Sequence, residues 1–348
     1  MASPVLDERS RDVLRSLIQL HIATAAPVGS ESLSRTLDRP LSPATIRNIM
    51  ADLERLGYLD HPHTSAGRMP TDEGYRVYVD SLMSHHLLPS REAAAIATEL
   101  DASGVSPHEV MDNASHLLSR LSRQVGFVLA PEMQRTSFRH IDLVRLPHPR
   151  ILVVMVSGTG LVTHKVIEVD DELTQDDLQA CANYLNANFT GLTLAAIRAR
   201  LLDMMGEEAA LYDTLLKRVV SVGERAFAAA GEDVSVSLDG ASNMLEQAEF
   251  EDVRRMRALL RTFEEKGRLV KILNACLSGG GVRVIIGHEN PDPELRGMTL
   301  VTASCTIEGD ASWGLGVMGS TRMEYARVMA LVDQVARTLA RTLHELRA

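Results

Sequence analysis

The stretch SPATIRNIMADLERLGYLDHPHTSAGRM, residues 42–69, decides the fold of the N-terminal part of the chain. Ser42 can cap the free amides of a helix, and Pro43 is tolerated at the first helical position. Five apolar side chains then fall on one arc of that helix: Ile46, Ile49, Met50, Leu53 and Leu56. The pattern predicts a helix that begins after Ser42 and packs this arc against a core.

The opposite face of the predicted helix suits a DNA groove. It presents Ala44, Arg47, Asn48, Ala51 and Arg55, with Thr45 and Asp52 on its flank. An arginine can donate two hydrogen bonds to a guanine, an asparagine can pair with an adenine, and alanines allow a close approach. On an isolated helix such a face is more often simply solvated. The neighbouring sequence therefore has to decide between the two interpretations.

Two further helices are predicted before this one. Residues 7–23 carry apolar side chains at spacings of three and four, which is typical of an amphipathic helix. Ser30 is expected to be the N-cap of a short second helix that directs Leu33 and Leu37 inward. The order of these elements is that of a helix-turn-helix unit, in which the helix after Ser42 is the recognition helix.

A wing is predicted after the third helix. Gly57 ends the helix, a strand begins at Tyr58 and Leu59, and HPHTSAGR supplies a polar loop. Gly67 is expected to adopt a turn conformation that other residues rarely take. In the same loop, hydroxyl and guanidinium groups offer donors to phosphates or to the minor groove. These donors belong to Thr64, Ser65 and Arg68.

Together these patterns predict a winged helix-turn-helix domain over residues 1–88 that binds double-stranded DNA. The predicted contact residues are Ser42, Ala44, Thr45, Arg47, Asn48, Arg55, Thr64, Ser65 and Arg68. Charge does not carry this prediction, because residues 1–80 hold nine Arg and no Lys against eleven acidic residues, a net of -2. The whole chain has a net charge of -10, which argues against non-specific coating of nucleic acid.

The run PVGSESL, followed by SPATIRNIMADLERLGYLDHPHTSAGRMPTDEGYRVYVD, resembles the HrcA family of heat-shock repressors over about residues 27–80. The ending WGLGVMGSTRMEYARVMALVDQVARTLAR, residues 313–341, resembles the C-terminal signature of the same family. The chain departs from common members in its 32 Arg against 4 Lys, which changes the character of phosphate contacts more than the fold. The resemblance implies a dimeric repressor that binds an inverted-repeat operator called CIRCE upstream of chaperonin genes and is kept active by the GroEL chaperonin.

The remaining two thirds of the chain reads as α+β. Strand-like runs lie at 126–130, 138–146, 150–157, 161–169, 234–240, 282–287, 298–306 and 313–318, and helical periods at 91–100, 107–123, 174–230, 247–277 and 322–346. Strands, a helical block and strands again suggest one mixed domain with an insertion from about 195 to 278. The resemblance implies a GAF-like domain in two parts, 89–194 and 279–348, around an inserted dimerisation domain at 195–278.

Several classes of protein are disfavoured. No stretch approaches the roughly 20 apolar residues of a membrane helix, and the N-terminus MASPVLDERSRD is acidic and polar, so we expect a cytoplasmic protein without a membrane partner. Cys181, Cys276 and Cys305 are far apart and in no metal-ligand spacing, so neither a metal nor a disulfide is expected. The sequence shows no catalytic nucleophile paired with a general base and no nucleotide-binding fingerprint. We therefore expect neither an enzyme nor a cofactor.

Two alternatives stay open beside the heat-shock repressor. A winged-helix repressor could respond to a small ligand in its GAF-like domain, or the winged helix could be a protein-interaction module that reads no DNA. His288 and Glu289, in a loop with Pro291 and Pro293, are candidates for an effector or partner contact, because ordered loops often carry function. Metabolite panels would test the first alternative, and a gel shift the second.

Overall fold

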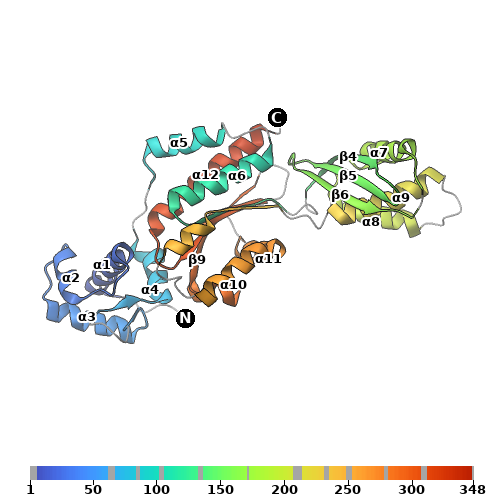
Figure 1. Ribbon diagram of the computed structural model, residues 1–348. Coiled ribbons are helices and arrows are strands. Elements are labelled where there is room, and N and C mark those ends of the chain that lie inside the picture. The colour runs from blue at the N-terminus through green and yellow to red at the C-terminus, as the bar shows by residue number, and fades with distance from the viewer. Residues whose placement is uncertain are drawn as a thin grey trace.

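The computed structural model has an N-terminal winged helix, a central α+β body and a second, smaller sheet with its own helices (Figure 1). The α+β class predicted from the sequence is confirmed. The structure describes residues 6–61, 67–83, 87–101, 106–131, 136–170, 172–206, 214–230, 235–247, 253–277, 281–306 and 312–346.

The winged helix follows the predicted order of elements. Its helices are α1 (Glu8–Thr24), α2 (Ser30–Thr36) and α3 (Pro43–Arg55), and its short hairpin pairs β1 (Leu59–Asp60) with β2 (Met69–Pro70). The chain leaves the hairpin through α4 (Asp72–Val77) and a π-helical turn η1 (Tyr78–Leu82). As predicted, the Ser42 hydroxyl accepts a hydrogen bond from the Thr45 amide at 3.1 Å and caps α3.

Three local expectations were wrong. Gly29 is the N-cap of α2, and Ser30 is its first helical residue. Leu56 is exposed instead of buried, because α3 ends at Arg55 and Leu56 is its C-cap. The Gly67 backbone lies outside the left-handed region. A Cβ there would lie 2.8 Å from the Pro27 carbonyl carbon, so glycine is needed for a close approach and not for a turn conformation.

The central body is an antiparallel sheet between two layers of helices. Its strand order is β7-β3-β10-β9-β8, formed by Val236–Asp239, Val125–Leu129, Ser312–Ser320, Met298–Thr306 and Val282–Ile286. One face packs against α5 (Ser90–Asp101), α6 (Pro107–Ser122) and α12 (Tyr325–Glu345), and the other against α10 (Val253–Glu264) and α11 (Lys266–Cys276) (Figure 1). Alternation along β3 explains this, since Val128 joins the first core and Phe127 the second.

The second sheet has the order β4-β5-β6, formed by Phe138–Arg145, Arg150–Ser157 and Val162–Glu168, all antiparallel. One of its faces is covered by α7 (Gln175–Phe189), α8 (Leu194–Gly206) and α9 (Thr214–Ala230). The core between them is separate from those of the central body, and the rings of Phe138 and Phe227 meet edge to face at 5.3 Å within it. In Figure 1 this unit projects from the central body on the side away from the winged helix.

The sheets divide the chain at places other than the predicted boundaries. β3 and β7 are paired neighbours, so the chain leaves the central sheet after Leu129 and returns to it at Val236. The inserted elements therefore span 138–230, whereas the prediction was 195–278. α10 and α11, which were assigned to the insertion, pack on the central sheet. The prediction failed because a strand's own sequence does not identify its partner, and residues 89–194 hold strands of both sheets.

Candidate nucleic-acid interface

The exposed face of α3 is the one expected from the sequence. Ala44, Arg47, Asn48, Ala51 and Arg55 are all exposed. The side chains on the other side of the helix, Ile46, Met50 and Leu53, are fully or almost fully buried in the core that also contains α1. The amphipathic pattern thus fixes the rotation of α3 and leaves a polar stripe with small residues free for a groove.

Neighbouring residues orient the polar groups on this stripe. Arg47 Nε donates to the Ser30 hydroxyl at 3.2 Å, which ties α3 to the start of α2. The two terminal nitrogens of the guanidinium take no part in this hydrogen bond. Arg55 forms an ion pair with Asp52 one turn before it. Among the described residues, none donates to or accepts from the Asn48 amide. Arg47 and Asn48 therefore carry the donors that are least committed to the fold.

The remaining predicted contact residues on α3 stabilise its first turn. The hydroxyls of Ser42 and Thr45 lie 2.9 Å apart, and Ser42 is the cap of the helix. Ser42 is exposed and Thr45 is half-buried. Both lie at the N-terminus of α3, where backbone amides and the helix dipole favour an anion such as a phosphate. Their position is consistent with a contact to the DNA backbone, which stays a prediction.

Arg68 in the wing is engaged within the protein. Its Nε donates to Glu54 on α3 at 2.7 Å, and one terminal nitrogen lies 2.9 Å from His61 Nδ1. Its backbone exchanges two hydrogen bonds with Val28, at 2.9 and 3.0 Å. Arg68 thus holds the wing against the loop before α2 and against α3, and its contact with DNA stays a prediction. Thr64 and Ser65 lie outside the described residues.

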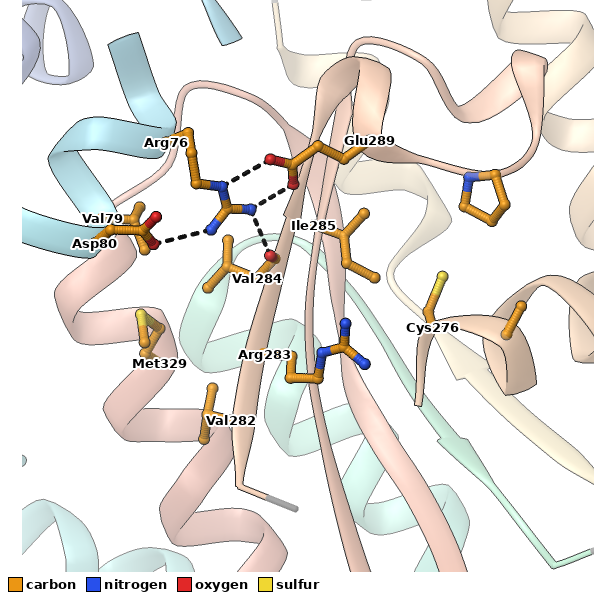
Figure 2. A pocket seen from close by; sticks show the side chains of 12 residues that line it. Arg76, Val79, Asp80, Cys276, Val282, Arg283, Val284, Ile285, Glu289 and Met329 are labelled. Atoms are coloured by element: carbon orange, nitrogen blue, oxygen red, sulfur yellow. Dashed lines mark hydrogen bonds and ion pairs between the residues drawn. The ribbon is translucent and has the colours of Figure 1, made fainter. Parts of the chain in front are cut away.

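A second polar cluster joins the winged helix to the central body (Figure 2). Arg76 from α4 donates through Nε to Glu289 Oε1 at 2.7 Å and through a terminal nitrogen to the Val284 carbonyl at 2.7 Å, and it also contacts the second oxygen of Glu289 and Asp80. Burial opposes ionisation of Glu289, but hydrogen bonds from Arg76 and from the Ile286 amide outweigh it and lower the Glu289 pKa. The pair lines one end of a pocket of about 770 Å³ beside β8.

The loop that follows β8 also forms hydrogen bonds with α4. Asp72 Oδ2 accepts hydrogen bonds from the His288 amide at 2.9 Å and from its ring at 3.2 Å, and the ring also lies 3.3 Å from Glu73. Beside them, the buried ring of Tyr325 on α12 lies 5.7 Å from the ring of Tyr75. The loop that holds His288 and Glu289 therefore has a partner within this chain, namely the winged helix.

The sequence singled out His288 and Glu289 as candidates for a partner contact, but it did not identify α4 as the partner. Arg76 and Glu289 are 213 positions apart, and neither position has a local pattern that identifies the other. The available signal was the charged run TDEGYR directly after the wing, which has more acid and base than a simple connector needs. Within the described residues, no group of His, Cys, Asp or Glu could hold a metal ion, and no helix is both long and apolar enough to cross a membrane.

Comparisons with known proteins agree with this architecture. A family model described as the winged helix-turn-helix transcription repressor, HrcA DNA-binding, matches residues 5–81, and one described as the HrcA protein C-terminal domain matches residues 108–329. The chain is 41% identical over 338 residues to the heat-inducible transcription repressor HrcA of Geobacter sulfurreducens, covering 97% of this chain and 98% of the relative. It is 37% identical over 342 residues to the protein of the same name from Syntrophobacter fumaroxidans, covering 98% of each.

A solved structure described as a hypothetical protein at 2.2 Å resolution is similar in fold. Its TM-score is 0.65 at 22% sequence identity, and the match covers 98% of this chain and 100% of that one. This likeness extends over the winged helix and both sheets.

Proposed function

The chain belongs to the HrcA family of heat-inducible transcription repressors, and from that premise we propose that it represses chaperone and chaperonin operons as a dimer bound to an inverted-repeat CIRCE operator. The observation that carries the proposal is the exposed stripe of α3, where Arg47 and Asn48 stand between small alanines with the wing beside them. A repressor acts on the chromosome, so we place the protein in the cytoplasm. Its role is that of a DNA-binding regulator without catalysis.

A gel shift at near-physiological salt is the primary test of this function. Labelled inverted repeat is titrated with the full chain, with an excess of scrambled repeat as competitor. Retention of the labelled repeat supports specific reading. If the scrambled competitor removes the shifted band completely, the winged helix does not read this sequence. That result would instead favour a winged helix that serves as a protein-interaction module.

The dimer follows from how little one α3 can read. One recognition helix contacts only a few base pairs, and the acidic net charge of the winged helix adds no strong general attraction to phosphates. Two copies related by a twofold axis would read both halves of an inverted repeat and double the discrimination. We therefore expect a dimer at micromolar concentration in sedimentation velocity.

The outer face of the second sheet is the surface that best fits the dimer contact. Val144, Val162 and Val166 are 43%, 61% and 53% exposed, and in the register of the sheet they flank Leu152 and Val156 of β5, which are half-buried. Polar Asp142 and His164 lie between these valines, on either side of Val154, so the exposed aliphatic groups form two clusters. Monomeric proteins rarely expose large apolar patches to water. A twofold axis can pair such a face with itself. The sequence led us to expect the dimer contact within 195–278. Because of the exposed valines, we now propose that β4, β5 and β6 form it.

A charge on this face provides the test. Val166→Lys is expected to shift the sedimentation of the protein from dimer to monomer. Gln179→Lys adds the same charge on the helical side of the same unit and is the matched control, because Gln179 is exposed on α7. If Gln179→Lys dissociates the dimer and Val166→Lys does not, the contact lies on the helices instead.

We also propose dependence on a GroEL-type chaperonin. β3 pairs with β7 and β10, which come from beyond the inserted unit, so the central sheet cannot close until distant segments of the chain have met. Sheets of this kind fold slowly and expose strand edges and apolar surface on the way. Operator binding by refolded protein should rise when chaperonin and ATP are added. Complete spontaneous recovery after heating and cooling would contradict this part of the proposal.

A further inference from the structure

A polar pocket of about 640 Å³ lies where the winged helix meets the end of α6 and the start of α12. It shares no lining residue with the pocket beside β8, and among the described parts of the winged helix only the end of α1 lines it, at Ile22. Its size is in the range of pockets that hold small metabolites. Among the polar residues that line it are Arg123, Gln124, Asn243, Gln247, Arg322 and Arg327.

Three arginines give the pocket a positive wall. Arg123 is exposed at the end of α6, in a left-handed conformation with φ 56°, and no described residue pairs with its guanidinium. Arg322 donates to the Ile22 carbonyl at 3.0 Å, and Arg327 donates to Glu92 at 2.8 Å. Among the described residues, Glu324 also lines the pocket and Glu92 forms the ion pair with Arg327. The three arginines therefore outnumber these two described carboxylates.

Amides form the inner wall of the pocket. Gln124 is only 8% exposed, and its Oε1 accepts a hydrogen bond from Gln247 Nε2 at 3.0 Å. Asn243 fixes the same region by donating to the Gln124 carbonyl at 3.0 Å. Gln247 Oε1 is buried and has no hydrogen-bond partner among the described residues. An acceptor in that state is costly, and a ligand N–H or O–H group that reaches it would remove the cost.

We infer that this pocket binds a small organic anion, one that carries a phosphate or carboxylate group for the arginines and an N–H or O–H donor for Gln247. The start of α12 adds to the same preference, because no side chain caps its first turn and the N-terminus of a helix favours an anion. Apolar residues on the remaining wall, among them Leu121 and Val328, can cover the uncharged part of the ligand.

The position of the pocket gives the ligand contact with two parts of the molecule. Ile22 belongs to the last turn of α1 in the winged helix, and Arg322 spans from the pocket to its carbonyl. A ligand bound to Arg322 would therefore touch the winged helix and the central body together. One alternative from the sequence was a winged-helix repressor controlled by a small ligand, and the inference gives that ligand a binding site. It does not rest on operator binding.

Isothermal titration calorimetry of the full chain without DNA tests the inference. The probes are adenosine monophosphate, succinate and inorganic phosphate, with adenosine as the uncharged comparison. We expect saturable binding of adenosine monophosphate or of succinate, and their ranking separates phosphate from carboxylate recognition. Adenosine should give no saturable heat. Absence of saturable binding for all three anions at millimolar concentration overturns the inference.

Two variants show whether any binding uses this pocket. Arg123→Gly removes a charge at a position whose φ glycine adopts freely, and it should weaken the bound anion about tenfold or more. Arg337→Ala removes an exposed arginine on α12 outside the pocket and should leave binding unchanged. Equal affinities for the two variants would place the anion elsewhere and overturn the assignment. Because no DNA is present, failure here and failure of operator binding are distinguishable.

Discussion

The ion pair between Arg76 and Glu289 joins the winged helix to the central body. Breaking this pair should lower the free energy of unfolding by a measurable amount. The two side chains are only 24% and 29% exposed, and Glu289 accepts hydrogen bonds from Arg76 and from the Ile286 amide. An exposed pair contributes about 0 to 1 kcal/mol, and loss of one partner from a buried pair costs about 3 to 5 kcal/mol. For this half-buried geometry we expect Glu289→Gln to lower the free energy of unfolding by about 2 kcal/mol.

A double-mutant cycle isolates the interaction from other effects of each substitution. Arg76→Gln, Glu289→Gln and the double variant are unfolded in urea, and the fluorescence of Trp313 is recorded. Trp313 is the single tryptophan of the sequence and lies in the core that the winged helix shares with the central body. The coupling energy should be about 2 kcal/mol, since residues in direct contact show interaction energies of about 0.5 to 3 kcal/mol.

The ion pair of Arg337 with Asp333 is the matched control, because its side chains are 67% and 45% exposed on α12. Its coupling energy should be below about 0.5 kcal/mol. If the cycle for Arg76 and Glu289 gives a value as small as this control, the joint does not hold the winged helix in the way argued above.

Three further predictions concern stability. The stability from Glu289 should be fully present above its ordinary pKa of 4.5 and fall as pH drops through its lowered value, because its folded-state pKa is depressed; urea unfolding at several pH values should show this loss in the wild type and not in Glu289→Gln. Gly74→Ala should destabilise by about 3 kcal/mol, because its Cβ would lie 2.2 Å from the Tyr58 carbonyl oxygen, whereas Gly267→Ala, with open space around it, should change the urea midpoint little. Ser42→Ala removes the cap of α3 and should cost about 1 kcal/mol in the same assay, and an unchanged midpoint would refute the capping argument.

The parts of the fold that depend on neighbouring residues were predictable from the sequence. The start of α3 at Pro43 and its buried arc at Ile46, Met50 and Leu53 follow from a cap and a period, and both are confirmed. Leu56 satisfies the same period but lies one residue beyond the helix, where periodicity no longer determines burial.

The features that the sequence did not reveal are produced by contacts between distant segments. Gly67 is required by the approach of Pro27, and the limits of the inserted unit are set by which strands pair with β3. The candidate site shows the same division. Helical geometry alone predicted that Arg47 and Asn48 lie on the exposed face of α3, whereas the engagement of Arg68 with Glu54 needs the packed wing.

Discrimination between operator and scrambled repeat by Arg47→Ala and Asn48→Ala tests the central claim most directly. Each variant is measured in competition binding at two salt concentrations, beside the wild type and Arg337→Ala. Loss of one bidentate base contact should remove about 1 to 3 kcal/mol of discrimination, so the two variants should bind the operator more weakly and tolerate changes in the half-site, while Arg337→Ala keeps the wild-type preference. An operator preference that survives both substitutions intact would contradict the placement of α3 in the major groove.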